Sequence, residues 1–109
     1  MKLETAERIS SAQATEVDIG HAFADDHGRG EYIILSRAEQ IFIQASGEGE
    51  GPYAVEYRDG GKDRHFQCTR DLSKAEVETV FLKYLRGDSG WLTDLEWRPL
   101  ETKPWWKFW

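Results

Sequence analysis

The sequence has a single cysteine, Cys68, among its 109 residues. One cysteine cannot form an internal disulfide, which is typical of a protein that works in a reducing compartment. No apolar run approaches the ~18 residues of a membrane-spanning helix, and the first five residues lack the apolar segment of a signal peptide. These absences predict a cytoplasmic protein that does not enter a membrane.

Positive charge is also scarce. Lys and Arg number 14 against 20 Asp and Glu, which gives a formal net charge of −6. A nucleic-acid binder needs a basic surface to displace counterions, so this class is not expected. The shortage of positive charge lies in the first 60 residues, which hold 5 Lys and Arg against 12 Asp and Glu. Residues 61–109 hold 9 Lys and Arg against 8 Asp and Glu. An acidic half either serves solubility or steers a basic partner toward the protein.

Motifs for metal binding and catalysis are missing as well. His21, His27 and His65 lie far apart in the sequence, whereas structural zinc sites use closely spaced Cys and His pairs. Cys68 follows His65 by three residues, and residues three apart on a strand point to opposite faces. No nucleophile elbow, phosphate-binding loop or dinucleotide-binding motif occurs. We therefore expect no catalytic residue, no cofactor and no metal, and Cys68 as a small buried apolar side chain.

The middle of the chain carries four segments with strand character. Short connections between successive strands predict an antiparallel meander. If Gly60-Gly61 is a two-residue turn, then Val55 pairs with Phe66 and Glu56 lies opposite His65. In the preceding hairpin, we expect Leu35 to pair with Ile41. The four segments are Glu31–Ser36, Gln40–Ala45, Tyr53–Arg58 and Lys62–Thr69.

This register predicts an apolar face that a helix must cover. Ser73 and Glu76 have the spacing of a capping box, and apolar residues follow from Val77 at the spacing of one helical face. Gly87 suits the left-handed residue that ends a helix. The apolar face of the sheet consists of Ile33, Leu35, Ile41, Ile43, Tyr53, Val55, Phe66 and Cys68.

The two ends of the chain have weaker patterns. Apolar residues three apart predict a short N-terminal helix over residues 3–12, and the alternation around Val17 and Ile19 predicts an edge strand. Residues 90–100 predict a turn and a last strand that ends near Pro99. The fold class is thus α+β: an antiparallel meander of four to six strands, one capped amphipathic helix on one face, and a short N-terminal helix. We expect one domain over residues 1–103, followed by an aromatic tail over 104–109.

The other face of the predicted sheet is the candidate binding surface. Aromatic and apolar side chains lie there beside charged ones, a combination that marks interaction sites. An ordinary solvated sheet face has a similar pattern. The candidate partner-binding residues of this face are Tyr32, Phe42, Glu56, Arg58 and His65.

The tail adds Trp105, Trp106 and Trp109 as further candidates, because four of the last five residues are aromatic. Three interpretations stay open. The tail completes the protein's own core, or it binds a partner or a second copy of the chain, or it lies at a membrane interface, where Trp is favoured. Lys103 and Lys107 are the only positive charges near the tail, and set against an acidic whole they disfavour the membrane.

The order of helix, meander, capped helix and Trp-containing close is similar to that of small bacterial immunity proteins of polymorphic toxin systems, in particular those associated with deaminase-type toxins. The segments that carry this resemblance are Tyr32–Leu35, Val55–Tyr57, Leu72–Gly87 and Leu95–Trp97. The resemblance implies a cytoplasmic, non-catalytic inhibitor that neutralises a toxin by direct binding.

Two functions from different classes follow. The first is a protein-binding domain, an immunity-type inhibitor whose partner is a basic toxin. The second is a small-ligand-binding or enzymatic domain that uses the polar part of the sheet face. A deep pocket with converging polar groups would favour the second function, and an open surface the first.

Overall fold

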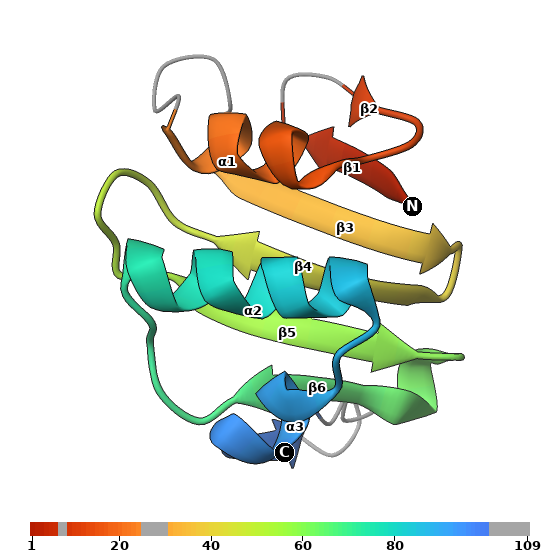
Figure 1. The fold of residues 1–109 in the computed structure, drawn as a ribbon. Coiled ribbons are helices and arrows are strands. Elements are labelled where there is room, and N and C mark those ends of the chain that lie inside the picture. The colour runs from red at the N-terminus through yellow and green to blue at the C-terminus, as the bar shows by residue number, and fades with distance from the viewer. Residues whose placement is uncertain (7–8, 25–30, 101–109) are drawn as a thin grey trace.

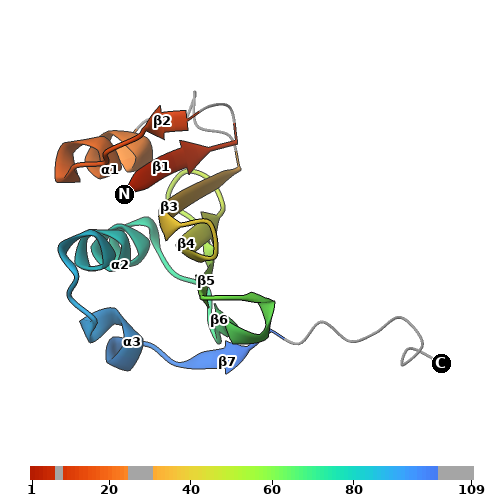
Figure 2. The same cartoon turned by 90° about the vertical axis from the view of Figure 1, so that its right-hand side faces the viewer.

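The computed structural model describes residues 1–6, 9–24 and 31–100. In this part of the chain, seven antiparallel strands form one sheet in the order β2-β1-β3-β4-β5-β6-β7. Three α-helices lie against one face of the sheet, and the opposite face carries no helix (Figure 1, Figure 2). The predicted α+β class and antiparallel meander are confirmed, with seven strands where four to six were expected. The strands are β1 (Lys2–Thr5), β2 (Ile9–Ser11), β3 (Tyr32–Ala38), β4 (Ile41–Ser46), β5 (Ala54–Asp59), β6 (His65–Cys68) and β7 (Trp97–Pro99), and the helices are α1 (Glu16–Ala24), α2 (Lys74–Arg86) and α3 (Gly90–Asp94).

The register between β3 and β4 differs from the prediction by two residues. Leu35 pairs with Ile43 rather than Ile41, and a bulge at Arg37 separates the pairs of Ser36 and Ala38. Because side chains on a strand alternate with a period of two, this shift moves no side chain to the other face. Leu35 and Ile43 are therefore fully buried under the helices.

The register between β5 and β6 is also shifted by two. The predicted two-residue turn at Gly60-Gly61 is wrong, because a 3₁₀ turn over Lys62–Arg64 lengthens the connection. Tyr57 pairs with Phe66, and Arg58 pairs with His65. The predicted pairing of Glu56 with His65 is thus wrong as a register, although both residues stay on the same face.

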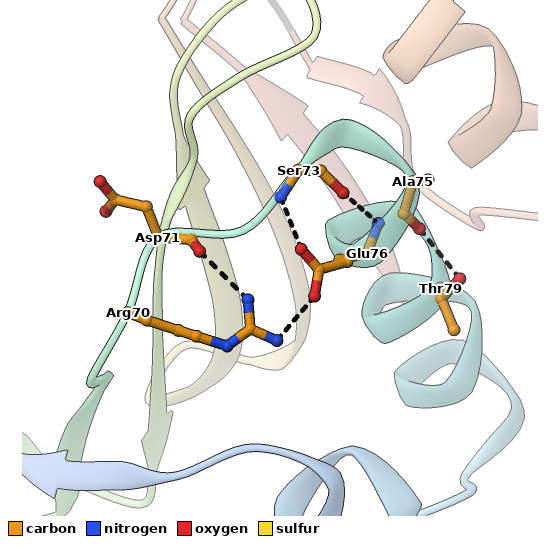
Figure 3. A network of polar contacts seen from close by, with 6 residues as sticks. All are labelled: Arg70, Asp71, Ser73, Ala75, Glu76 and Thr79. Carbon is orange, nitrogen blue, oxygen red and sulfur yellow. Dashed lines mark hydrogen bonds and ion pairs between the residues drawn. The ribbon is translucent and has the colours of Figure 1, made fainter.

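Helix α2 begins and ends where the sequence predicted. The Ser73 hydroxyl accepts a hydrogen bond from the Glu76 amide at 3.2 Å, and the Glu76 carboxylate accepts one from the Ser73 amide at 3.0 Å (Figure 3). The second carboxylate oxygen of Glu76 lies 2.6 Å from Arg70. At the other end, Gly87 has φ 76°, a left-handed conformation that costs glycine little. The buried face of α2 consists of Val77, Val80, Phe81 and Tyr84.

The N-terminal prediction is wrong in both parts. Residues 3–6 and 9–12, the described part of that range, form no helix. Instead β1 pairs with β3, and Leu3 and Thr5 alternate inward as a strand requires. The expected strand around Val17 lies within α1. The Thr15 hydroxyl accepts from the Asp18 amide at 3.3 Å, and the Asp18 carboxylate accepts from the Thr15 amide at 2.9 Å, which is a reciprocal cap at the start of a helix.

The C-terminal part of the described chain contributes to an aromatic cluster of Tyr57, Trp91 and Trp97. The predicted last strand is confirmed as β7, and the predicted turn before it is the short helix α3. Trp91 on α3 lies edge-on to Trp97 on β7 with ring centroids 5.6 Å apart, and both lie edge-on to Tyr57. No helix of the described chain is long and apolar enough to cross a membrane.

Candidate protein-binding surface

The face of the sheet opposite the helices is built from the strand residues that alternate with the buried ones. We call it the outer face. Its side chains form rows that follow the strand pairing, such as Ser36, Phe42, Arg58 and His65 across four neighbouring strands. The outer face consists of Lys2, Glu4, Tyr32, Ile34, Ser36, Phe42, Gln44, Ser46, Ala54, Glu56, Arg58, His65, Gln67 and Arg98.

The Arg58 side chain is held from three sides. Its Nη1 donates to Gln40 Oε1 at 2.7 Å, and its Nε donates to His65 Nδ1 at 3.1 Å. Its guanidinium carbon lies 5.4 Å from the centre of the Phe42 ring, within the range of a cation–π interaction. Arg58 is therefore restrained by its neighbours, and the residue as a whole is partly exposed.

His65 links Arg58 to Glu56. Because His65 Nδ1 accepts from Arg58, its ring proton resides on Nε2, which lies 3.0 Å from a carboxylate oxygen of Glu56. The His65 side chain is 10% exposed and that of Glu56 is 22% exposed. The result is a chain of hydrogen bonds from Gln40 through Arg58 and His65 to Glu56, and each bond polarises the next.

Four of the predicted surface residues thus come together. Phe42, Glu56, Arg58 and His65 form one cluster, and the rings of Phe42 and His65 lie 6.0 Å apart, edge to face. Tyr32 does not join it. It pairs with Ser46 at the far end of β3 and is 36% exposed. The candidates Trp105, Trp106 and Trp109, and the whole tail over 104–109, lie outside the described residues.

A groove that the sequence did not indicate runs beside this cluster. It has a volume of about 660 Å³, opens to solvent, and reaches from Phe42 to β1. Ile34 and Phe42 supply apolar wall, while Lys2 and Glu4 form an ion pair of 2.9 Å at its side. Sequence reasoning missed the groove because it assigned β1 to a helix. The available signal was the alternation of Lys2 and Glu4 with the apolar Leu3.

The cluster on the outer face offers donors on Arg58, acceptors on Glu56 and an aromatic ring on Phe42. Cys68 lies 5% exposed on the helix-bearing face, opposite to His65, as expected of a buried thiol. In residues 1–6, 9–24 and 31–100, no three His, Cys, Asp or Glu side chains gather in a way that could hold a metal ion.

Comparison of the chain with protein-family models, with curated proteins and with solved structures found no match in any of the three.

Proposed function

We propose that this chain is a non-catalytic protein-binding domain, and that it acts as a cytoplasmic immunity-type inhibitor that neutralises a toxin by covering it. The binding surface is the outer face, centred on Phe42, Glu56, Arg58 and His65.

One observation carries the proposal: an arginine on a sheet face that no described helix covers is held in a single position by its neighbours. Arg and aromatic residues dominate the binding energy of protein interfaces. Binding normally costs the freedom of such side chains, about 0.5–1.5 kcal/mol for each one immobilised. Gln40, His65 and Phe42 already restrain Arg58, so that a partner does not have to.

The shape of the surface supports a protein partner. The groove is open, and its apolar residues Ile34 and Phe42 lie between charged ones. An open groove with an apolar floor suits an inserted loop or side chain of another protein, whereas small-ligand sites are more enclosed. The acidic surplus of the first 60 residues favours a basic partner, because opposite charge raises the rate of encounter.

The test is protection of growth. The chain is co-expressed with the product of a neighbouring gene that is toxic on its own, and growth is measured with the wild type and with Phe42→Ala and Arg58→Ala. We expect the wild type to restore growth and both variants to protect at least tenfold less, because each removes an anchor worth ~2 kcal/mol or more.

Arg86→Ala is the matched control. Arg86 makes an exposed ion pair with Glu16 on the helix-bearing side, and such pairs contribute little to stability. This variant should protect as the wild type does, and thermal melts should show all three variants folded. Protection that survives in Arg58→Ala and Phe42→Ala would place the binding surface elsewhere. A neighbouring product with no toxicity would count against the immunity role.

A further inference from the structure

The apolar part of the outer face is left partly open by the described residues. Ile34 and Phe42 are only partly buried, and Tyr32 is 36% exposed. The three helices lie on the opposite face, so no described helix covers these side chains (Figure 2). The groove beside them, of about 660 Å³, is within the ~300–1,000 Å³ of pockets that hold drug-sized molecules. An indole ring is smaller than such a molecule and fits in this space.

The described chain ends at the side of this face. The Leu100 amide donates a hydrogen bond to the His65 carbonyl at 2.8 Å. His65 pairs with Arg58 on the next strand, and Arg58 pairs with Phe42 on the one after. Leu100 therefore lies at the end of the row of paired residues that crosses the sheet toward the groove.

Nine residues follow Leu100 in the sequence, and they are long enough to cross the outer face. Neighbouring strands lie about 4.8 Å apart, so β4 with Phe42 is ~14 Å from β7, and β1 on the far side of the groove is ~24 Å from it. An extended chain spans ~3.3–3.6 Å for each residue. The five residues to Trp105 can therefore span ~17 Å, and the nine to Trp109 can span ~30 Å.

The composition of these residues matches an apolar groove. Four of the last five side chains are aromatic, and each buries about 150–250 Å² when it is packed. Monomeric proteins rarely expose so large an apolar area, so the four need a surface to cover. Aromatic rings pack well edge to face, as Phe42 and His65 already do on the outer face. The four residues are Trp105, Trp106, Phe108 and Trp109.

The edge of β7 is a poorer place for them. The Leu100 amide faces β6, so by alternation the backbone groups of Pro99 point away from the sheet. Proline has no N–H, and a strand added at this edge would lack one of its hydrogen bonds. The strand is also only three residues long. Contact between side chains on the outer face is thus favoured over backbone pairing at the edge.

We propose that the aromatic tail over 104–109 crosses the outer face of its own chain and packs in the groove, with its rings against Ile34 and Phe42. The tail then covers the surface that the function proposed above assigns to a partner, and a partner must displace it to bind. The inference concerns the chain alone and does not rest on that function, so it is tested without any partner.

The test measures nuclear magnetic resonance contacts in the full chain. We expect nuclear Overhauser effects between the indole rings of the tail and the side chains of Ile34 and Phe42. The indole N–H groups of the tail should also exchange with solvent about tenfold or more slowly than those of a free peptide with the sequence of residues 101–109, because packing protects them. A sample that mixes labelled and unlabelled chains tells contacts within one chain from contacts between two.

Two variants locate the contact. Phe42→Ala removes a wall of the groove and should bring the exchange rates of the tail to within about twofold of those of the free peptide, with Trp91 unchanged. Val17→Ala is the matched control, because Val17 is an apolar residue, 64% exposed, on the helix-bearing side. In this variant, the tail should exchange as slowly as in the wild type.

Three results would overturn the proposal. The first is a set of tail contacts with Leu92, which is exposed on the helix-bearing side, in place of those with Ile34 and Phe42. The second is contacts that occur only between two chains, which would make the groove a site for the tail of a second copy. The third is exchange of the wild-type tail at the rate of the free peptide. All three are measured on the wild type, so the proposal is decided even if Phe42→Ala does not fold.

Discussion

His65 has one acceptor nitrogen and one donor nitrogen in this fold, and its neighbours decide which is which. Arg58 can only donate, so His65 Nδ1 must be unprotonated and the proton must lie on Nε2, toward Glu56. We expect the nitrogen resonances of the neutral His65 ring to show the Nε2-protonated tautomer. An Nδ1-protonated neutral ring would show that Arg58 does not bind there.

Glu76 gives a pH-dependent contribution to stability with a defined sign. Hydrogen bonds from Arg70, and then from the Ser73 amide, lower its pKa from 4.5 to about 2. A carboxyl whose pKa is lower in the folded state stabilises the fold above its unfolded value, and that contribution is lost as the pH falls from about 4.5 to about 2. We expect Glu76→Ala to lower the melting temperature at pH 6, and the difference from the wild type to shrink steadily as the pH falls toward 2.

Thr79→Ala on the same helix is the control for that experiment, since Thr79 has no ionisable side chain and lies outside the capping box. Its difference from the wild type should change less between pH 6 and pH 2. If Glu76→Ala and Thr79→Ala gave the same pH dependence, the contacts of Glu76 with Arg70 and Ser73 would not persist in solution.

At the scale of single residues, the sequence predicted which residues share the outer face better than it predicted which of them pair with one another. The period of two along a strand keeps Phe42, Arg58 and His65 on one face when the register shifts by two residues. The contacts depend on turn lengths, which local sequence determines weakly. The 3₁₀ turn over Lys62–Arg64 moves the register between β5 and β6 by two residues, so Arg58 rather than Glu56 lies opposite His65. Between β3 and β4, a turn at Glu39-Gln40 and the one-residue bulge at Arg37 together give a shift of two.

Among the elements, α2 combines a local cap with a buried face, and the two can be separated by mutation. Ser73→Ala removes the acceptor of the cap and should lower the free energy of unfolding by about 1 kcal/mol. Phe81→Ala leaves a cavity beside Phe23, whose ring centre lies 5.3 Å away, and should cost ~3–5 kcal/mol. Urea melts measure both. A larger loss for Ser73→Ala than for Phe81→Ala would contradict this division between cap and core.

The contrast between α2 and the N-terminal elements explains what could be predicted at this scale. In helix α2, the cap, the left-handed residue at its end and the spacing of its buried residues all predict the same helix. Helix α1 is nine residues long, and its buried side chains are Ile19 and Phe23. Strand β1 is four residues long. The residues around Leu3 alone fit either a strand or a helix. The pairing of Leu3 with Leu35, 32 residues away, decides for the strand. The pattern of neighbouring residues gives no information about that distant contact.

For the whole molecule, the one-sided arrangement of helices divides the sheet into a face that makes the core and a face that meets the surroundings (Figure 2). The core runs without a break from Leu3 on β1 to Trp91 on α3. Each strand is hydrogen-bonded to its neighbours within the sheet, so the outer face is built on strands rather than on loops. Such elements position side chains more accurately than loops do.

The continuous core predicts that the described chain unfolds as one unit, and Cys68 offers a direct reporter. Cys68 is the only cysteine in the sequence, is 5% exposed, and lies on β6 opposite Trp97 of β7. A thiol reagent should label it slowly in the native state, and in urea the midpoint of rapid labelling should coincide with the midpoint of the far-ultraviolet circular dichroism transition. Both probes report the same event because β6 belongs to the central sheet and to the aromatic cluster. Asp71→Cys in a Cys68→Ala background places an exposed thiol nearby and should label at once without urea. Labelling of Cys68 at clearly lower urea than the loss of the dichroism signal would show that α3 and β7 separate first, and that the core consists of two units instead of one.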